Sequence, residues 1–334
     1  MADHSIAGRF RQGLILTVGV ATLLYGGYFA WVGAEEVGDA LASFRWSVFG
    51  VLLLLSLGNY VLRFVRWEFF LRRLSIRVPL GSSALIFLAG LAMTITPGKV
   101  GEFLKSYLLK ESHDIGMART APVVIAERIG DLLGLLLLAS FGVASLGGPQ
   151  TTWLLGLGVA GIVAVLVVLQ SESLTRWSID LVGRLPLGSR IAPRLAEALV
   201  SSRVLLGGRP LIVGLLLGTA AWYLECFGYY YVFTGFADAS IPLGTGVFGY
   251  AFSTLAGVFT PGGVGVTDGL LIKLADQAGA GSDVTLAAAF LVRLATLWFA
   301  VLLGAIALLR FQGAIAVDVD AARAGKAPAP VSSD

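Results

Sequence analysis

The stretch TPGKVG, residues 96–101, interrupts an apolar segment that would otherwise make a good membrane helix. Apolar residues lead into it over 80–95 and continue after it over 103–109. The chain nearly repeats the stretch as TPGGVG at residues 260–265. Proline removes a backbone donor and glycine admits turns, so each stretch should break its helix. Inside a membrane, such backbone persists only where it is buried in protein or lines a wet cavity.

The composition is that of a polytopic membrane protein. Hydrophobic residues make up 57% of the 334 residues and charged residues 13%, and the mean hydropathy is +0.85. These values exclude an ordinary soluble domain. The sequence has one cysteine, Cys226, and two scattered histidines, His4 and His113. We therefore expect no disulfide framework, no metal site and no cofactor.

Apolar runs long enough to cross ~30 Å of hydrocarbon predict the transmembrane helices. The first run is longer than a usual signal-peptide core, so we interpret it as an uncleaved anchor, with a cleaved signal as the alternative. Two further apolar stretches, 80–96 and 241–260, each run into one of the breaks. The predicted spans are residues 14–32, 46–67, 118–146, 152–169, 211–233 and 285–309.

Lys and Arg collect on the cytoplasmic side of membrane proteins and so predict the orientation of the chain. If each broken stretch is a re-entrant hairpin, the arginine-rich loop 170–210 falls on the cytoplasmic side, where its amphipathic part would lie on the membrane surface. The segment 33–45, which is mainly acidic, falls outside. The sequence therefore predicts an all-α protein with six spans, two re-entrant hairpins and both termini cytoplasmic.

The breaks belong to a longer repeat. Arg128 follows Pro97 by 31 residues, and Arg293 follows Pro261 by 32 residues. An odd number of crossings separates the two copies, so we expect an inverted repeat whose tips meet near the midplane, as in many secondary transporters. The two copies are residues 46–146 and 211–309.

One break alone would be as consistent with a packing kink as with a functional tip, because Gly and Pro are common in membrane helices. Two near-identical breaks favour functional tips, since paired interrupted segments mark binding sites in transporters. The residues predicted at the tips are Pro97, Gly98, Gly101, Pro261, Gly262, Gly263 and Gly265.

Ionisable residues inside apolar helices usually mark sites or pathways. In AERIGD, residues 126–131, Arg128 and Asp131 are three positions apart and can pair; the alternative is a self-neutralised cluster that only locks the helices. Arg293 has no acid three or four positions away, so its partner must be Glu225, Asp268 or an anionic ligand. The predicted charge partners or coupling groups are Glu102, Glu127, Asp131, Glu225 and Asp268.

Arginines and a lysine at glycine-rich tips suit a phosphate, which accepts charge-assisted hydrogen bonds. A lipid phosphate fits best, because the acyl chains can stay in the bilayer while the headgroup crosses. Arg63 and Arg66 lie near the end of their span and could also snorkel toward headgroups. The predicted phosphate-binding residues are Arg128, Arg293, Lys99, Arg63 and Arg66.

The motifs RFVRW, TPGKVGEFLKSYLL, AERIGD, TPGGVGVTDG and LVRL occur in this order along the chain. Together they resemble the flippase-like membrane family, the lysylphosphatidylglycerol synthase transmembrane region of UPF0104 type. The resemblance covers about residues 10–310. It implies a lipid-moving region, which in bifunctional relatives carries an aminoacylated phospholipid across the inner membrane. Asp268 and Lys105 stand where relatives often have glutamate and arginine, which leaves the lipid substrate open.

The resemblance and the charges together predict a stand-alone lipid flippase of the bacterial cytoplasmic membrane. We expect one transmembrane domain over residues 1–310, a disordered tail over 311–334, no soluble synthase domain and no enzymatic activity. The cargo would be an anionic or aminoacylated phospholipid or a polyprenyl-phosphate lipid. A separate lipid-modifying enzyme is a candidate partner, and nucleic acid is not. The alternative is a membrane scaffold subunit of a lipid or glycan pathway that transports nothing itself.

Overall fold

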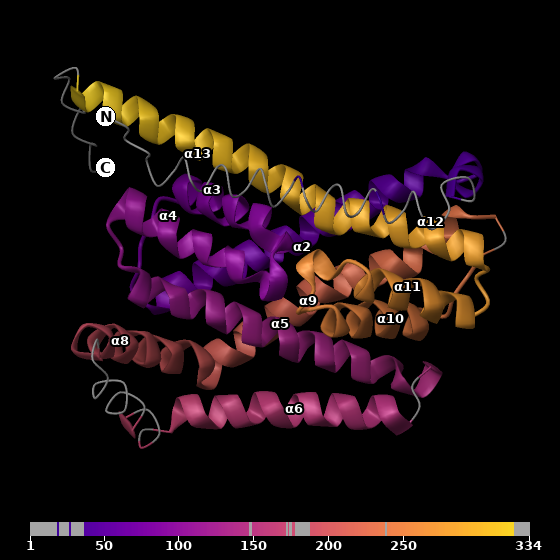
Figure 1. Cartoon of the computed structure of the whole chain (residues 1–334), viewed down its shortest axis with the longest axis horizontal. Helices are drawn as coiled ribbons and strands as arrows, with labels where there is room; N and C mark the ends of the chain where they lie inside the picture. Colours follow the sequence, from indigo (N-terminus) through magenta and orange to yellow (C-terminus); the bar gives the residue numbers. More distant parts are fainter. Residues whose placement is uncertain are drawn as a thin grey trace.

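The computed structural model describes most of the chain between residues 37 and 323. The predicted first span, apart from two single positions in it, and residues 324–334 of the predicted tail lie outside the described residues. The described part is helical throughout and contains no strand (Figure 1). The described residues are 37–146, 149–171, 188–237 and 239–323, with single positions 19, 27, 173, 176 and 177.

Long helices alternate with shorter ones along the chain (Figure 1). The long helices are α2 (Trp46–Arg73), α5 (Met117–Leu146), α6 (Pro149–Gln170), α8 (Gly188–Leu206), α9 (Gly208–Val232) and α13 (Phe299–Arg323). The shorter helices are α3 (Leu80–Leu91), α4 (Leu104–His113), α10 (Leu243–Ala256), α11 (Val266–Gln277) and α12 (Ser282–Arg293). Tight 3-10 turns are η1 (Ala92–Ile95), η2 (Pro97–Phe103), η3 (Phe233–Gly235) and η4 (Pro261–Gly263), and η5 (Leu294–Trp298) is a π-helical turn.

Each predicted span from 46–67 to 211–233 coincides with a helix of the structure, and 285–309 falls on the continuous run of α12, η5 and α13. In the described residues, three helical stretches are long and apolar enough to cross a membrane. The six-span count and the re-entrant course of the broken segments remain predictions. Helix α13 continues to Arg323, past residue 310, where the sequence predicts the tail to begin. The three stretches are Trp46–Arg73, Gly208–Gly235 and Ser282–Phe311.

Helix α2 exposes a row of apolar side chains and buries polar and ionisable ones among the apolar residues of its inner face. Its buried face carries Asn59, Arg63 and Arg66, which are 0%, 3% and 0% exposed. A soluble helix would show the reverse pattern. The arrangement suits a lipid surround, in which ionisable groups face the protein interior. The exposed apolar side chains of the opposite face are Leu54, Leu57, Val61 and Val65.

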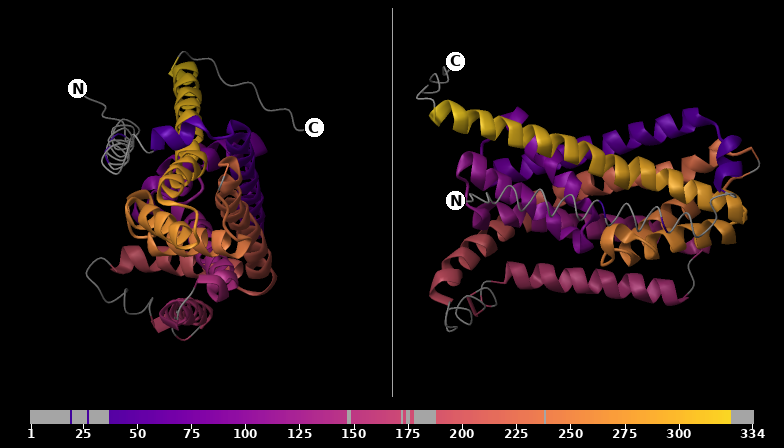
Figure 2. Two further views of the ribbon diagram at one scale, coloured as in Figure 1. Left: turned by 90° about the vertical axis from the view of Figure 1, so that its right-hand side faces the viewer. Right: turned by 45° about the horizontal axis from the view of Figure 1, so that its top comes forward.

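The helices run roughly along the long axis of the molecule and pack in pairs (Figures 1 and 2). Helix α2 packs along α9, α5 touches α6, α8, α9 and α10, and α13 lies against α3 and η1. Small residues allow the closest approaches. A Cβ added to Gly304 of α13 would lie 2.1 Å from the backbone nitrogen of Ala92.

The apolar core falls into two large clusters. One surrounds the first half of α2 and the second half of α5. The other surrounds the second half of α2 and the first half of α5. The two broken segments lie where the clusters meet, so the breaks are placed at the centre of the packed helices.

The two breaks begin with the same backbone conformation. Thr96 and Thr260 are extended, with ψ of 146° and 147°, and the chain then turns at Gly98 and Gly262, with φ of 61° and 58°. Glycine suits this left-handed conformation because it has no Cβ to clash. In both breaks the threonine hydroxyl donates to the carbonyl three residues earlier, at 2.7 and 2.9 Å. The TPG repeat in the sequence is therefore also a repeat in structure.

The two breaks also touch each other. The backbone N–H of Gly98 donates to the carbonyl of Val258, at 2.8 Å. A Cβ added to Gly262 would lie 3.0 Å from a side-chain carbon of Ile95. Segments separated by more than 150 residues in the sequence thus meet inside the protein, as the sequence predicts.

Candidate functional site

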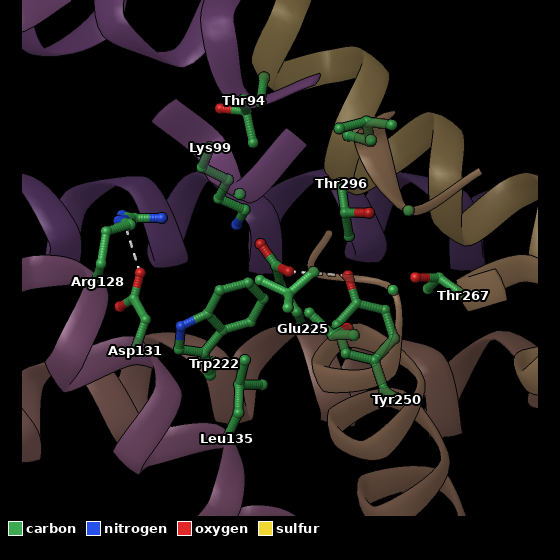
Figure 3. Close-up of a pocket in the computed structure, with 18 of the residues that line it drawn as sticks. Thr94, Lys99, Arg128, Asp131, Leu135, Trp222, Glu225, Tyr250, Thr267 and Thr296 are labelled. Atoms are coloured by element: carbon green, nitrogen blue, oxygen red, sulfur yellow. Dashed lines mark hydrogen bonds and ion pairs between the residues drawn. The ribbon is translucent and has the colours of Figure 1, made fainter. Parts of the chain in front are cut away.

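A cavity of about 130 Å³ lies where the two breaks meet, and we call it the central cavity (Figure 3). Helices α2, α5, α9 and α10, the two breaks and the α12–α13 junction contribute its walls. A cavity of ~150 Å³ holds a benzene molecule, so this one holds a compact polar group but no acyl chain. Its charged lining residues are Arg63, Lys99, Arg128, Asp131, Glu225 and Arg293.

Glu102, which follows the first break, joins three cations. Its carboxylate lies 3.2 Å from Arg63, 3.1 Å from Arg128 and 3.4 Å from Lys105. The Glu102 side chain is 1% exposed. A carboxylate buried this deeply is tolerated because it is paired several times over. Glu102 therefore ties the first break to α2 and α5.

Asp131 and Glu127 extend this network along α5. Asp131 lies 2.9 Å from Arg128, which confirms the predicted pair, and 2.7 Å from Arg66. Glu127 pairs with Lys105 at 2.5 Å and faces away from the central cavity. The ion pairs of the AERIGD segment thus hold α5 against its neighbours. Through Arg128 and Asp131, the segment also forms part of the cavity wall.

Asp268, which follows the second break, is the protein partner of Arg293. The two side chains are 2.9 Å apart. Asp268 also accepts a hydrogen bond from the backbone N–H of Gly265 at 3.2 Å, which caps the first turn of α11. Arg293 in turn donates to the carbonyl of Gly262. Of the two protein partners that the sequence leaves open, Glu225 and Asp268, the structure pairs Arg293 with Asp268.

Both breaks therefore follow one design. An acidic residue shortly after the break, Glu102 or Asp268, binds the arginine of a later helix, Arg128 or Arg293. The spacings differ, because Glu102 comes five residues after its proline and Asp268 seven. Each pair fastens the segment after its break to a helix later in the chain, α5 or α12.

Lys99 differs from the other cations of the cavity. Among the described residues, it has no carboxylate within 4.0 Å, and its ammonium lies 4.5 Å from the ring centre of Trp222. Its φ of 54° is left-handed, a conformation that costs a non-glycine residue roughly 1–2 kcal/mol. The second break has glycine at this place, Gly263. A lysine is thus held where glycine would be less strained.

Further donors face the cavity without a partner in the described part of the chain. The indole Nε1 of Trp222 and the hydroxyl of Thr94 are buried and make no hydrogen bond there. Figure 3 shows both side chains around the same space as the Lys99 ammonium. Unpaired buried donors are costly, and an anion would satisfy them. This side of the cavity therefore suits an oxyanion.

The cavity wall also includes Glu225, one helical turn after Trp222 on α9. Its carboxylate accepts a hydrogen bond from the hydroxyl of Tyr250 at 2.8 Å. Nearby, the hydroxyl of Tyr60 donates to the carbonyl of Thr296 at 2.8 Å. Thr296 lies in the π-helical turn η5, just after Arg293, and such turns often occur at functional sites.

Four of the five predicted phosphate-binding residues line the cavity, namely Lys99, Arg63, Arg128 and Arg293. Arg66 does not: it is fully buried against Asp131, outside the cavity lining. The idea that Arg63 and Arg66 snorkel toward headgroups is wrong, because both side chains point into the protein and are 4% and 0% exposed.

The predicted tip residues divide in the same way. Gly98, Gly262 and Gly263 line the cavity, and the rest of the tip residues shape the breaks. Gly101 is needed for space, since an added Cβ would lie 2.6 Å from Cβ of Met93. The tip residues outside the lining are Pro97, Gly101, Pro261 and Gly265.

Sequence reasoning missed the aromatic and hydroxyl part of the lining. A signal was present for two of the aromatics. Tyr60 precedes Arg63 by three residues, and Trp222 precedes Glu225 by three, so each aromatic shares a helix face with a cavity charge. The lining residues not foreseen include Tyr60, Thr94, Trp222, Tyr250 and Thr296.

Comparison with known proteins supports the motif-based resemblance. A family model described as lysylphosphatidylglycerol synthase TM region matches residues 13–304. The chain belongs to this family. A UPF0104 membrane protein of Methanothermobacter thermautotrophicus is 25% identical over 333 residues, which span 92% of this chain and 97% of the relative. Both breaks and the whole central cavity fall within the part that the family model matches.

Membership establishes a membrane protein of the lysylphosphatidylglycerol synthase TM region family. The buried positions of Asn59, Arg63 and Arg66 in α2 agree with that setting, because ionisable residues within a membrane helix usually face the protein interior. The family match covers the membrane region and names no ligand for the cavity. The chemistry of the cavity must therefore be argued from its own residues.

Proposed function

We propose that this protein is a lipid flippase, which moves a lipid with a phosphate-containing headgroup between the two leaflets of a membrane. The cargo class is an anionic or aminoacylated phospholipid or a polyprenyl-phosphate lipid. The observation that carries the proposal is the central cavity, which lies inside an apolar shell. Within the described residues, Lys99 has no ion-pair partner there, and the buried donors of Trp222 and Thr94 have no hydrogen-bond partner.

The size of the cavity favours a headgroup as its occupant. About 130 Å³ accommodates a phosphate and a small substituent. Acyl or polyprenyl chains must stay outside, and the exposed apolar faces of the helices offer them a suitable surface. A lipid would thus cross with its polar end in the protein and its chains in the bilayer.

The charges favour an anion. Each arginine of the lining is paired with a carboxylate, so these pairs hold the cavity in shape whether or not a ligand is bound. Lys99 is left to meet the ligand, together with the donors of Trp222 and Thr94. Hydrogen bonds from charged donors to phosphate are worth ~1.5–3 kcal/mol each, enough to select an anionic group.

The paired breaks favour transport over a static role. We propose that the two hairpins, α3–α4 and α10–α11, are re-entrant and enter from opposite faces as an inverted repeat. Alternating access would then expose the tips to one leaflet at a time. We also propose a cytoplasmic-membrane location with both termini on the cytoplasmic side, and a transport role without catalysis.

The test is a leaflet assay in liposomes. The purified protein is reconstituted with phosphatidylglycerol labelled on an acyl chain with a dithionite-sensitive fluorophore, and dithionite is added outside. Protein-free vesicles should lose only the outer-leaflet signal, whereas vesicles with protein should lose nearly all of it. The protein-free vesicles also correct for the unaided crossing of phosphatidylglycerol. Bleaching that stops at the outer leaflet at every protein density would contradict transport and favour the scaffold alternative.

A further inference from the structure

Glu225 is a buried carboxylate without a cationic partner in the described part of the chain. It is 7% exposed and has no Lys or Arg nitrogen within 4.0 Å there. Its carboxylate accepts a hydrogen bond from the neutral hydroxyl of Tyr250 at 2.8 Å. An ionised carboxylate in such a place is costly, and a protonated one much less so. The other carboxylates of the site, Glu102, Asp131 and Asp268, each have an arginine.

Glu225 also borders a second, smaller cavity on its other side. This cavity has a volume of about 10 Å³, close to the space that one water molecule requires. The hydroxyl residues Ser56 and Thr296 line it together with Glu225. The carboxylate therefore borders two spaces, the central cavity and a water-sized one whose other lining residues are mainly apolar.

Lys99 is the cation that Glu225 faces across the central cavity. Figure 3 shows the Lys99 ammonium and the Glu225 carboxylate pointing toward each other from η2 and α9. Arg63, Arg128 and Arg293 are engaged by other carboxylates. The charged and titratable groups around Glu225 are Tyr60 and Arg63 of α2, Lys99 of η2, Asp131 of α5, Cys226 of α9, Tyr250 of α10 and Arg293 of α12.

We propose that Glu225 is a proton-binding site coupled to binding of the lipid phosphate. The ionised Glu225 carboxylate and the phosphate compete for the Lys99 ammonium. This inference rests on the proposed function and adds a coupling ion to it. When Glu225 is ionised, it attracts the Lys99 ammonium. When Glu225 takes a proton from water, Lys99 is free to bind the phosphate. Phosphate binding and proton binding therefore favour each other, and by linkage the effect is reciprocal.

The sign of the pH dependence follows from this competition. The neutral form of Glu225 gains population as the pH falls, so the affinity for the phosphate should rise as the pH falls. A phosphodiester keeps its single negative charge over this range, so the change comes from the protein. In the window where one proton is taken up per ligand, affinity changes by about tenfold per pH unit.

Calorimetric titration of the full chain in nanodiscs tests the proposal. The probe is dihexanoylphosphatidylglycerol, titrated at pH values from about 5 to about 8. At each pH, buffers of different ionisation enthalpy are compared, because the change in observed binding enthalpy gives the number of protons taken up per ligand. Glu225→Gln keeps an oxygen for Tyr250 and should bind with the wild-type low-pH affinity at every pH, without proton uptake. Glu111→Gln, an exposed change outside the cavity lining, should behave as wild type.

Tyr250→Phe is the second variant, in case Glu225→Gln does not fold. It removes the hydrogen bond that stabilises the ionised carboxylate, so the midpoint of the pH dependence should move to higher pH. An unchanged midpoint would contradict the assignment to Glu225.

The outcomes separate the two proposals. Wild-type affinity that does not vary with pH, or a Glu225→Gln variant that keeps the wild-type pH dependence, overturns the proton site and leaves the flippase proposal standing. Absence of binding by wild type at every pH overturns both.

Glycerophosphoglycerol, the same headgroup without acyl chains, is the second probe. If it binds as tightly and with the same pH dependence, the proton site is supported and a free phosphodiester replaces the lipid as ligand.

Discussion

At the scale of single residues, Lys99 has a backbone conformation that costs a lysine more free energy than it would cost a glycine. It occupies a left-handed conformation that glycine occupies more easily, and the second break has Gly263 there. Backbone strain of this kind clusters at functional sites. Lys99→Gly should therefore leave the free energy of unfolding unchanged or raise it by ~1 kcal/mol. Thermal unfolding of the purified variant measures this, and a fall in melting temperature would show that Lys99 stabilises the fold.

The pair of Arg293 and Asp268 should behave in the opposite way. Arg293→Gln leaves Asp268 buried without its cation, which costs ~3–5 kcal/mol in comparable pairs. Asp268→Asn in the same chain removes the stranded charge and should restore much of that stability. Thermal unfolding of wild type, both single variants and the double variant completes a double-mutant cycle, which measures the interaction between the two side chains. Additive losses in the double variant would mean that the ion pair contributes nothing as a pair.

The residue-level predictions succeeded where spacing along a helix decides the contact. Arg128 and Asp131 are three positions apart on α5, so their pairing follows from helix geometry. The contact of Arg63 with Glu102 spans 39 residues and depends on how α2 packs beside the first break. Nothing in the local sequence specifies that packing. The burial of Arg66 was missed for the same reason.

At the scale of elements, α13 and η1 approach each other with no room for a side chain. A Cβ on Gly304 would lie 2.1 Å from the backbone nitrogen of Ala92, and a backbone atom cannot move aside as a side chain can. Gly304→Ala should therefore destabilise the protein by ~1–3 kcal/mol. Gly50→Ala in α2 is the matched control, since nothing lies within 4 Å of its added Cβ, and it should be neutral or stabilising. Equal melting temperatures would contradict the close approach.

The sequence located the helices and the breaks because their signals are local. Long apolar runs marked the helices, and the TPG stretches marked η2 and η4. The π-helical turn η5 was not predicted, because its sequence LATLW contains no proline or glycine that would indicate an irregular turn. Its conformation depends on the cavity side of the α12–α13 junction, where Tyr60 bonds to the Thr296 carbonyl.

At the scale of the whole molecule, the order of the motifs predicted the family, and the chain does belong to it. The meeting of the two breaks was also predictable, because a repeated interruption points to a shared site. The composition of the site was not, since its aromatic and hydroxyl lining comes from helices that only the fold brings together. The topology in a membrane is still a prediction from charge.

Cysteine labelling tests that topology. Ser43→Cys and Ser178→Cys, each in a Cys226→Ser background, should react with a membrane-impermeant maleimide from opposite faces of the membrane. Ser43 lies in the acidic segment predicted outside, and Ser178 lies in the arginine-rich loop predicted inside. Inverted vesicles should exchange the two patterns. Labelling of both positions from one face would contradict the six-span arrangement.

The central claim is that the Lys99 side of the cavity carries a lipid phosphate across the membrane. The most direct measurement is the rate at which labelled phosphatidylglycerol changes leaflet in liposomes, with wild type and Lys99→Gly at equal amounts of folded protein. Loss of one charged bond to the phosphate predicts a rate about ten- to a hundredfold lower for the variant. Lys99→Arg, which keeps the charge, should retain most of the rate. Equal rates for wild type and Lys99→Gly would contradict the account.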